Sequence, residues 1–164
     1  FYSLRHDEAK RYYGEAAHAG ELPMEARFFR TLSAIEAGEG SDAIPVAESI
    51  LRYNGAPPSY LVAAAELLAL AGERANARAL CEKHGFFQEG AKVSRFRRAT
   101  LALALQEDVL AMELLEAAYR GREAELPWLH VDPRLARLRN NTSFLALDNA
   151  VFGDSANALP GRYS

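Results

Sequence analysis

The sequence has little that would hold it in a membrane or stabilise it outside the cell. It contains a single cysteine, Cys81, so an internal disulfide is impossible and a reducing compartment, the cytoplasm, is expected. No hydrophobic run reaches the roughly 18 residues that a membrane-spanning helix needs. No signal peptide is recognisable, and because the chain opens at Phe1 without methionine we interpret it as a piece of a longer protein.

Neither sign of charge dominates the sequence. The chain has 164 residues and a formal net charge of −3, from 19 basic and 22 acidic side chains. This weak acidic balance argues against nucleic acid or an anionic membrane as a direct partner. Because 49% of the residues are hydrophobic, the chain is long enough and apolar enough to form one domain with a substantial core.

Patterns that support catalysis or metal binding are missing from the sequence. None of the four histidines lies at metal-ligand spacing from another histidine or from Cys81. The glycine-containing stretch 38–40 is too short for a phosphate loop. His130 and Asp132 lie two residues apart, but a hydrolytic pair also needs a nucleophile, and no nucleophile elbow is present. We therefore predict a protein that is not an enzyme, with no cofactor and no metal, and an unreactive, buried Cys81.

What the sequence does contain is an interval of 34 residues that recurs along the chain. Small residues occupy one column of this repeat, at Ala9, Ala43, Ala77 and Ala111. Other columns follow the same interval: Phe28, Val62 and Phe96; Thr31, Ala65 and Ala99; Gly38, Gly72 and Gln106. Agreement of several columns on one interval indicates a repeat architecture.

Each repeat divides into two segments with apolar residues at helical spacing. The expected helix pairs are 24–37 with 42–53, 59–72 with 73–85, and 93–106 with 107–121; a further helix is expected at 6–20. Glycines and prolines separate the segments, as they do at helix ends. No stretch alternates in the manner of a β-strand, so the sequence predicts an all-α fold.

The interval and the small-residue columns resemble the tetratricopeptide repeat. The family places an aromatic residue four positions after the small residue, and Ala9 with Tyr13 fits, whereas Ala47, Cys81 and Leu115 hold that position elsewhere. The resemblance implies a right-handed α-solenoid of helix pairs with a C-terminal capping helical segment. The expected divisions are 1–23 (second helix of a truncated repeat), 24–57, 58–91 and 92–125 (whole repeats), 126–152 (cap) and 153–164 (tail).

The segment after the last repeat resembles the end of repeat arrays in some bacterial multidomain signalling proteins. There such arrays follow nucleotide cyclase, protein kinase or winged-helix modules. The matching residues are Pro127, Trp128, Leu129, Asp132, Pro133, Arg134, Leu138, Arg139, Phe144 and Leu147. The apolar side chains expected to cover the last repeat are Trp128, Leu129, Leu135, Leu138, Phe144 and Leu147. Asp132 is expected to cap a short helix that begins at Pro133, and a final helix from Thr142 or Ser143 to about Phe152 should follow.

The family resemblance also implies a concave binding face lined by the first helix of each repeat. The positions that correspond to it are Phe28, Leu32, Ile35, Val62, Glu66, Ala69, Phe96, Thr100 and Leu103. Two interpretations stay open: this apolar line binds a protein or peptide partner, or it packs against upstream repeats or another domain of the parent protein.

A basic run, Arg95, Arg97 and Arg98, surrounds Phe96. The simpler interpretation is a solvated face whose arginine stems cover apolar surface. The functional interpretation is contact with acidic groups of a partner, because guanidinium groups suit carboxylates.

The expected function is non-catalytic protein–protein interaction or scaffolding, as the regulatory or sensor part of a cytoplasmic bacterial protein in signalling or transcription regulation. The expected partner is a protein or peptide, with no direct nucleic-acid or membrane contact. Two alternatives remain: a regulatory domain acting on a fused cyclase or kinase, and a small-ligand sensor that uses the concave groove.

Overall fold

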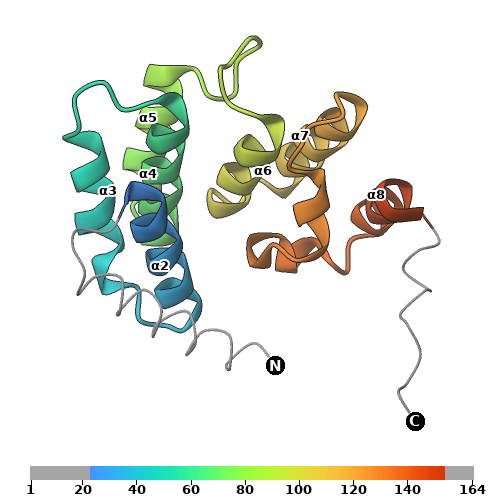
Figure 1. Ribbon diagram of the computed structural model, residues 1–164, viewed down its shortest axis with the longest axis horizontal. Coiled ribbons are helices and arrows are strands. Elements are labelled where there is room, and N and C mark those ends of the chain that lie inside the picture. Colours follow the sequence, from blue (N-terminus) through green and yellow to red (C-terminus); the bar gives the residue numbers. More distant parts are fainter. Residues whose placement is uncertain (1–22, 154–164) are drawn as a thin grey trace. The chain divides into compact units, whose positions relative to one another are not determined.

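The computed structural model describes residues 23–153, and all regular structure in this range is helical (Figure 1). The all-α class predicted from the sequence is therefore confirmed, while the right-handed solenoid stays a prediction. The expected helix at 6–20 and residues 154–164 of the expected tail lie outside the described residues. The chain divides between Val93 and Ser94 into two compact units.

The first unit contains two helix pairs. They are α2 (Met24–Glu36) with α3 (Ala43–Leu51), which follows the short 3-10 turn η1 (Gly40–Asp42), and α4 (Pro58–Leu70) with α5 (Arg74–His84). Pro58 starts α4, where the missing N–H is not needed by the helix. Both helix pairs match the pairs predicted from the apolar spacing to within a few residues.

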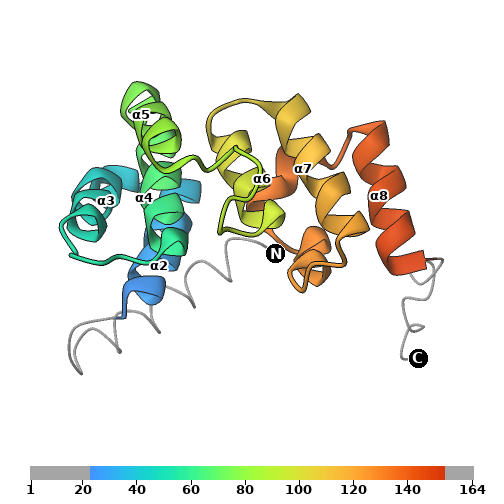
Figure 2. The ribbon, with the colours of Figure 1, turned by 90° about the horizontal axis from the view of Figure 1, so that it is seen from above.

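Helix α4 is the centre of the first unit. It packs against α3 and α5, its two sequence neighbours, and also contacts α2 (Figure 2). Its residues 62–69 are all buried. This explains why α4 has no polar face: a helix surrounded by other helices is apolar on every side.

The small residues of the repeat columns are buried, as expected for side chains between packed helices. Ala43 and Ala77, on the second helices of the first unit, are fully buried, and so is Ala111 in the second unit. Ala65 and Ala99 on first helices are buried equally. A larger side chain at these positions would push the paired helices apart.

The turn after each first helix is closed by the same hydrogen bond. The backbone N–H groups of Glu39, Glu73 and Glu107 donate to the carbonyl groups five residues earlier, at 2.7, 2.8 and 2.8 Å. Gly38, Gly72 and Gln106 precede these glutamates and have positive φ, of 79°, 94° and 66°. This is the hydrogen bond that closes a helix through a left-handed residue, and it recurs at the interval seen in the sequence.

The second unit opens with the pair α6 (Arg95–Ala104) and α7 (Asp108–Arg120). The start of α6 has two caps. Ser94 accepts a hydrogen bond from the N–H of Arg97, and the carboxylate of Glu123 accepts from the N–H groups of Arg95 and Phe96, each at 3.0 Å. Glu123 follows α7, so one side chain ties the beginning of this helix pair to its end.

The chain then forms two 3-10 turns, η2 (Leu126–His130) and η3 (Pro133–Leu138), and a final helix, α8 (Thr142–Phe152). Asp132 caps η3 by accepting from the N–H of Arg134 at 3.0 Å, as predicted. The last helix starts at Thr142, as predicted, and Asn141 supplies the capping oxygen for the N–H groups of Ser143 and Phe144.

Of the six apolar residues that were predicted to cover the last repeat from the end-piece (residues 126–152), five are buried. Those buried are Leu129, Leu135, Leu138, Phe144 and Leu147. The prediction for Trp128 was wrong, because 60% of this residue is exposed. In a 3-10 turn, side chains three residues apart share a face. Leu126 and Leu129 occupy the buried face of η2, so Trp128 points away from it.

Candidate functional site

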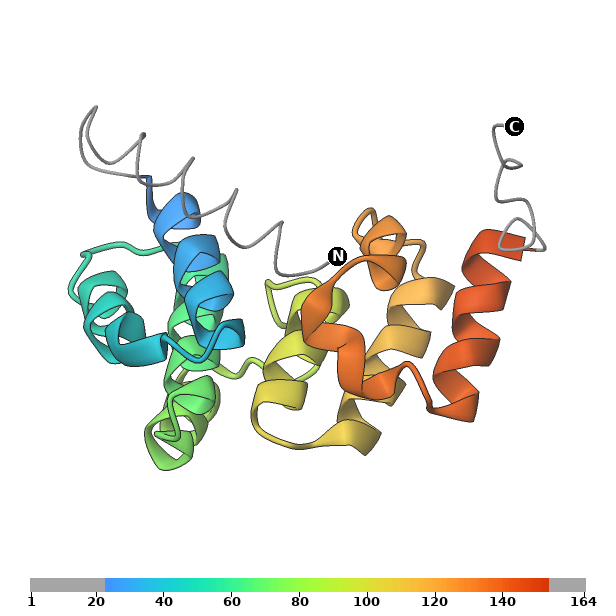
Figure 3. The ribbon, with the colours of Figure 1, turned by 90° about the horizontal axis from the view of Figure 1, so that it is seen from below.

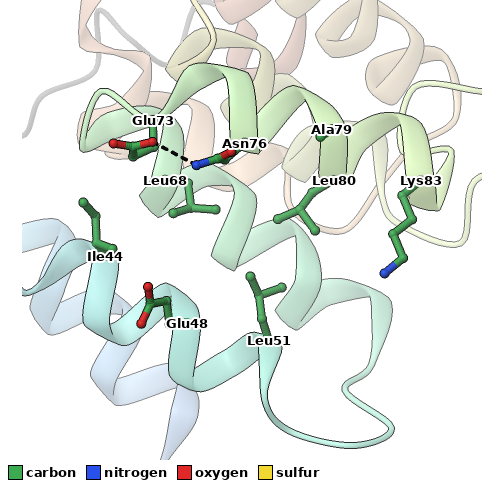
Figure 4. Close-up of a pocket in the computed structure, with 9 residues that line it drawn as sticks. All are labelled: Ile44, Glu48, Leu51, Leu68, Glu73, Asn76, Ala79, Leu80 and Lys83. Atoms are coloured by element: carbon green, nitrogen blue, oxygen red, sulfur yellow. Dashed lines mark hydrogen bonds between the residues drawn. The ribbon is translucent and has the colours of Figure 1, made fainter.

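An open groove lies in the first unit between the second helices α3 and α5. It has a volume of about 520 Å³. Figure 4 shows the side chains that line it, from three helices: Ile44, Glu48 and Leu51 on α3; Leu68 on α4; and Glu73, Asn76, Ala79, Leu80 and Lys83 at and along α5. Within the first unit, the groove follows the second helices and not the face that the family resemblance indicated.

The middle of the groove is apolar. Leu68 is buried at its floor, Leu80 is half-buried, and Leu51 is 37% exposed at its edge. Leu51 and Leu80 leave apolar surface open to water, and a second molecule gains free energy by covering it.

The rim of the groove carries charges of both signs. Glu73 lies at one end and Lys83 at the other, and Glu48 lies along the α3 wall (Figure 4). The Glu73 carboxylate accepts a hydrogen bond from the Asn76 side chain at 2.9 Å. Glu48 forms an exposed ion pair with Arg52 at 3.5 Å, which contributes little to stability because both side chains are hydrated. These rim groups are therefore accessible to another molecule.

The spacing of residues on α3 and α5 explains why the groove forms. On α3, Ala43, Ala47 and Ile50 are buried, whereas Ile44 and Leu51 lie seven residues apart on a neighbouring face. On α5, Ala77 and Cys81 are buried, and Leu80 lies beside them on the groove side. The second helices thus bury one stripe and leave part of a second apolar stripe uncovered. This second stripe is visible in the sequence, but the family resemblance indicated the first helices as the binding face.

A second, smaller cavity of about 280 Å³ lies next to the segment that follows α5. Its wall is mainly the 84–93 segment, together with Pro58 and Leu61. The rings of His84 and Phe86 stack at 5.5 Å in this segment. Within the described residues no group of histidine, cysteine and acidic side chains could hold a metal ion. The arrangement explains the local shape of this segment and indicates no particular chemistry.

The predicted concave-face residues are almost all buried. Phe28 and Leu32 on α2, Val62, Glu66 and Ala69 on α4, and Phe96, Thr100 and Leu103 on α6 are covered, and Ile35 is half-buried. Side chains in this state form part of the core and are not accessible to a partner in this conformation. These side chains are buried within this chain itself, so partner binding and packing against another part of the parent protein both stay predictions.

On α6 the covering segment is the chain's own end-piece. The guanidinium of Arg134 lies 3.4 Å from the Thr100 hydroxyl, and the guanidinium of Arg137 donates to the Leu103 carbonyl at 3.3 Å and to Asp108 at 2.9 Å. Figure 3 shows η3 beside α6, in agreement with these contacts. Two parts of the end-piece therefore contact the last helix pair: η3 lies against α6, and α8 packs on α7.

The basic run on α6 also has a partner within the chain. The Arg95 guanidinium pairs with Glu123 at 3.2 Å. Burial lowers the pKa of Arg98, Arg95 lowers it further, and Glu123 opposes the change. Arg97 and Arg98 are half-buried, with internal interactions of their own. This pattern favours the interpretation in which arginine stems cover apolar surface.

His130 and Asp132 do not form a pair with each other. The Nδ1 atom of His130 lies 3.1 Å from a carboxylate oxygen of Asp148, and its ring packs edge-on against Phe152. Asp132 pairs with Arg134 at 2.6 Å and caps η3. Each side chain thus holds the end-piece together, which accounts for both residues without catalysis. Cys81 is buried on α5, as predicted.

No family model, curated protein or solved structure matches the chain. The resemblance to the tetratricopeptide repeat therefore rests on the residues of the sequence and stays a prediction. No helix in the described part of the chain is long and apolar enough to cross a membrane. The groove between α3 and α5 is the feature of the described residues from which a function can be argued.

Proposed function

We propose that this chain is a non-catalytic protein-recognition module, the regulatory or sensor part of a bacterial signalling or transcription-regulating protein. The observation that carries the proposal is the groove between α3 and α5, with its apolar centre and charged rim. Protein interfaces combine an apolar centre that loses its water with a polar border that fixes the orientation of the partner. The groove offers both on helices of one compact unit.

The proposal moves partner binding from the first helices to the second helices. The first-helix positions are buried, whereas Leu51, Ala79 and the charged rim residues are exposed. A partner can reach the groove without any rearrangement of the core. The signalling context rests on the likeness of the end-piece to bacterial repeat arrays.

A small-ligand sensor is the second candidate, since the volume of about 520 Å³ falls in the range of small-molecule pockets. Such pockets usually enclose most of the ligand surface. This groove is open along its length, with Leu51 and Ala79 exposed at its walls, which favours a larger partner. The two candidates differ in the kind of molecule that binds the groove: a protein or a small ligand.

The test compares a groove variant with a matched control. Leu51→Gln with Leu80→Gln removes apolar surface from the groove and leaves every charge unchanged. Val109→Gln with Leu145→Gln makes the same kind of change at exposed positions on α7 and α8, where Val109 is 76% exposed. Circular dichroism should show that both variants remain helical.

The proposal is supported if the unchanged chain and the control variant capture a protein from a bacterial extract and the groove variant does not. The captured protein, once purified, should show the same pattern of binding to the three chains. Equal capture by all three chains would refute the proposal. The small-ligand sensor is supported instead if no protein is captured and a metabolite raises the melting temperature of the unchanged chain but not that of the groove variant.

A further inference from the structure

We infer that the groove between α3 and α5 binds an amphipathic α-helix of a partner protein, with a basic side chain at the Glu73 end and an acidic side chain at the Lys83 end. This inference rests on the proposed function and adds the shape and charge of the partner. It is drawn from the groove walls, their length and the charges on the rim.

The walls of the groove favour a helical partner over an extended one. They are helices, so their backbone N–H and C=O groups are already hydrogen-bonded within each helix. An extended peptide lying in the apolar centre would leave many of its own backbone groups without partners, at a cost of about 1–3 kcal/mol for each one that is buried. A helix bonds its backbone internally and presents side chains alone, which the apolar centre can cover.

The length of the groove matches a short helix. Along the α5 wall the groove extends from Glu73 to Lys83, a rise of about 15 Å at about 1.5 Å per residue. A partner helix of about three turns fills this length. Its apolar residues would lie three and four positions apart, in contact with Leu51, Leu68 and Leu80.

The rim determines the charges of the partner. Glu73 and Lys83 lie at opposite ends of the groove, and Glu48 lies on the opposite wall from Asn76 (Figure 4). A partner with a basic residue at the first end and an acidic residue at the second meets an opposite charge at each. A partner with the same charge at both ends is repelled at one of them.

The test uses synthetic helical peptides of about 11 residues with one shared apolar stripe. The mixed peptide has a basic residue at one end and an acidic residue at the other, and the basic peptide has basic residues at both ends. Binding to the whole chain is measured by fluorescence anisotropy at low salt. The unchanged chain should bind the mixed peptide about two- to fivefold more tightly than the basic one, since an exposed charge pair contributes about that much.

Reversal of one rim charge should reverse the preference. Lys83→Glu should bind the basic peptide more tightly than the mixed peptide, and Lys83→Gln should remove most of the difference. Lys92→Glu makes the same charge change outside the groove and should keep the original preference. High salt should reduce every difference.

Three results would overturn the inference. The first is an unchanged preference in Lys83→Glu. The second is equal affinity for a version of the mixed peptide in which a central proline prevents the helix. The third is no binding of any helical peptide while capture of a protein still depends on Leu51 and Leu80. In that third case the proposed recognition function is retained and the inference of a helical partner is rejected. Failure of the inference can therefore be told apart from failure of the proposed function.

Discussion

The contact of Glu123 with the start of α6 yields a quantitative prediction for the stability of the second unit. Its carboxylate accepts hydrogen bonds from the N–H groups of Arg95 and Phe96, both at 3.0 Å, and pairs with the Arg95 guanidinium. Its side chain is only 14% exposed. Glu123→Ala removes these contacts and leaves the first turn of α6 with only the Ser94 cap.

The expected loss follows from the kind of contact. A capping oxygen contributes about 1 kcal/mol, and a negative charge at a helix N-terminus adds about 0.3–1 kcal/mol. The ion pair with Arg95 adds little, because that side chain is 47% exposed. We therefore expect Glu123→Ala to lower the free energy of unfolding by about 1–2 kcal/mol.

The assay is urea unfolding followed by circular dichroism, together with hydrogen exchange of the Arg95 and Phe96 amides. Glu116→Ala is the control, since its ion pair with Arg120 is long, at 4.0 Å, and exposed. The control should change the free energy of unfolding by less than about 0.5 kcal/mol. Equal stability of the two variants, with unchanged exchange of both amides, would refute the capping role of Glu123.

Three further predictions concern packing and titration. Ala77→Trp should lower the free energy of unfolding by about 1–3 kcal/mol, because Ala77 is fully buried at a helix contact; unchanged melting would contradict this packing. Trp128→Ala should change that free energy by less than about 0.5 kcal/mol, because the indole is largely exposed, and a larger loss in urea unfolding would show that it packs. The Tyr60 hydroxyl donates to Glu25 at 2.5 Å, which raises the pKa of Tyr60, so this contact stabilises the fold below about pH 10 and is lost as the pH rises through the raised pKa. Glu25→Gln should lower that pKa in an NMR titration, and an unchanged titration of Tyr60 would count against the contact.

The helix pairs could be predicted from the sequence because each helix has its own local signals. The spacing of Phe28 and Leu32 defines α2, and the proline at the start of α4 and the glycine that follows α5 define helix ends. Asp132 as a cap was predictable for the same reason, since a capping residue acts on the N–H groups next to it.

Features that depend on contacts between distant residues were not predictable in this way. The pairing of Arg137 with Leu103 and Asp108 joins segments about thirty residues apart, and no local pattern indicates it. The orientation of Trp128 depends on which face of η2 is buried, and the sequence favoured the larger side chain. The apolar stripes of α3 and α5 are visible in the sequence, but their meeting in one groove depends on both helices packing on α4.

The repeated turns after the first helices keep one backbone shape with different residues. Glycine adopts a left-handed conformation without steric cost, as at Gly38 and Gly72. Gln106 holds the same conformation, with a φ of 66°, although a side chain there costs about 1 kcal/mol or more. The third turn therefore adopts its shape against the preference of its own residue, and the hydrogen bond from Glu107 closes it as in the other two turns. The backbone shape of this turn therefore does not depend on glycine.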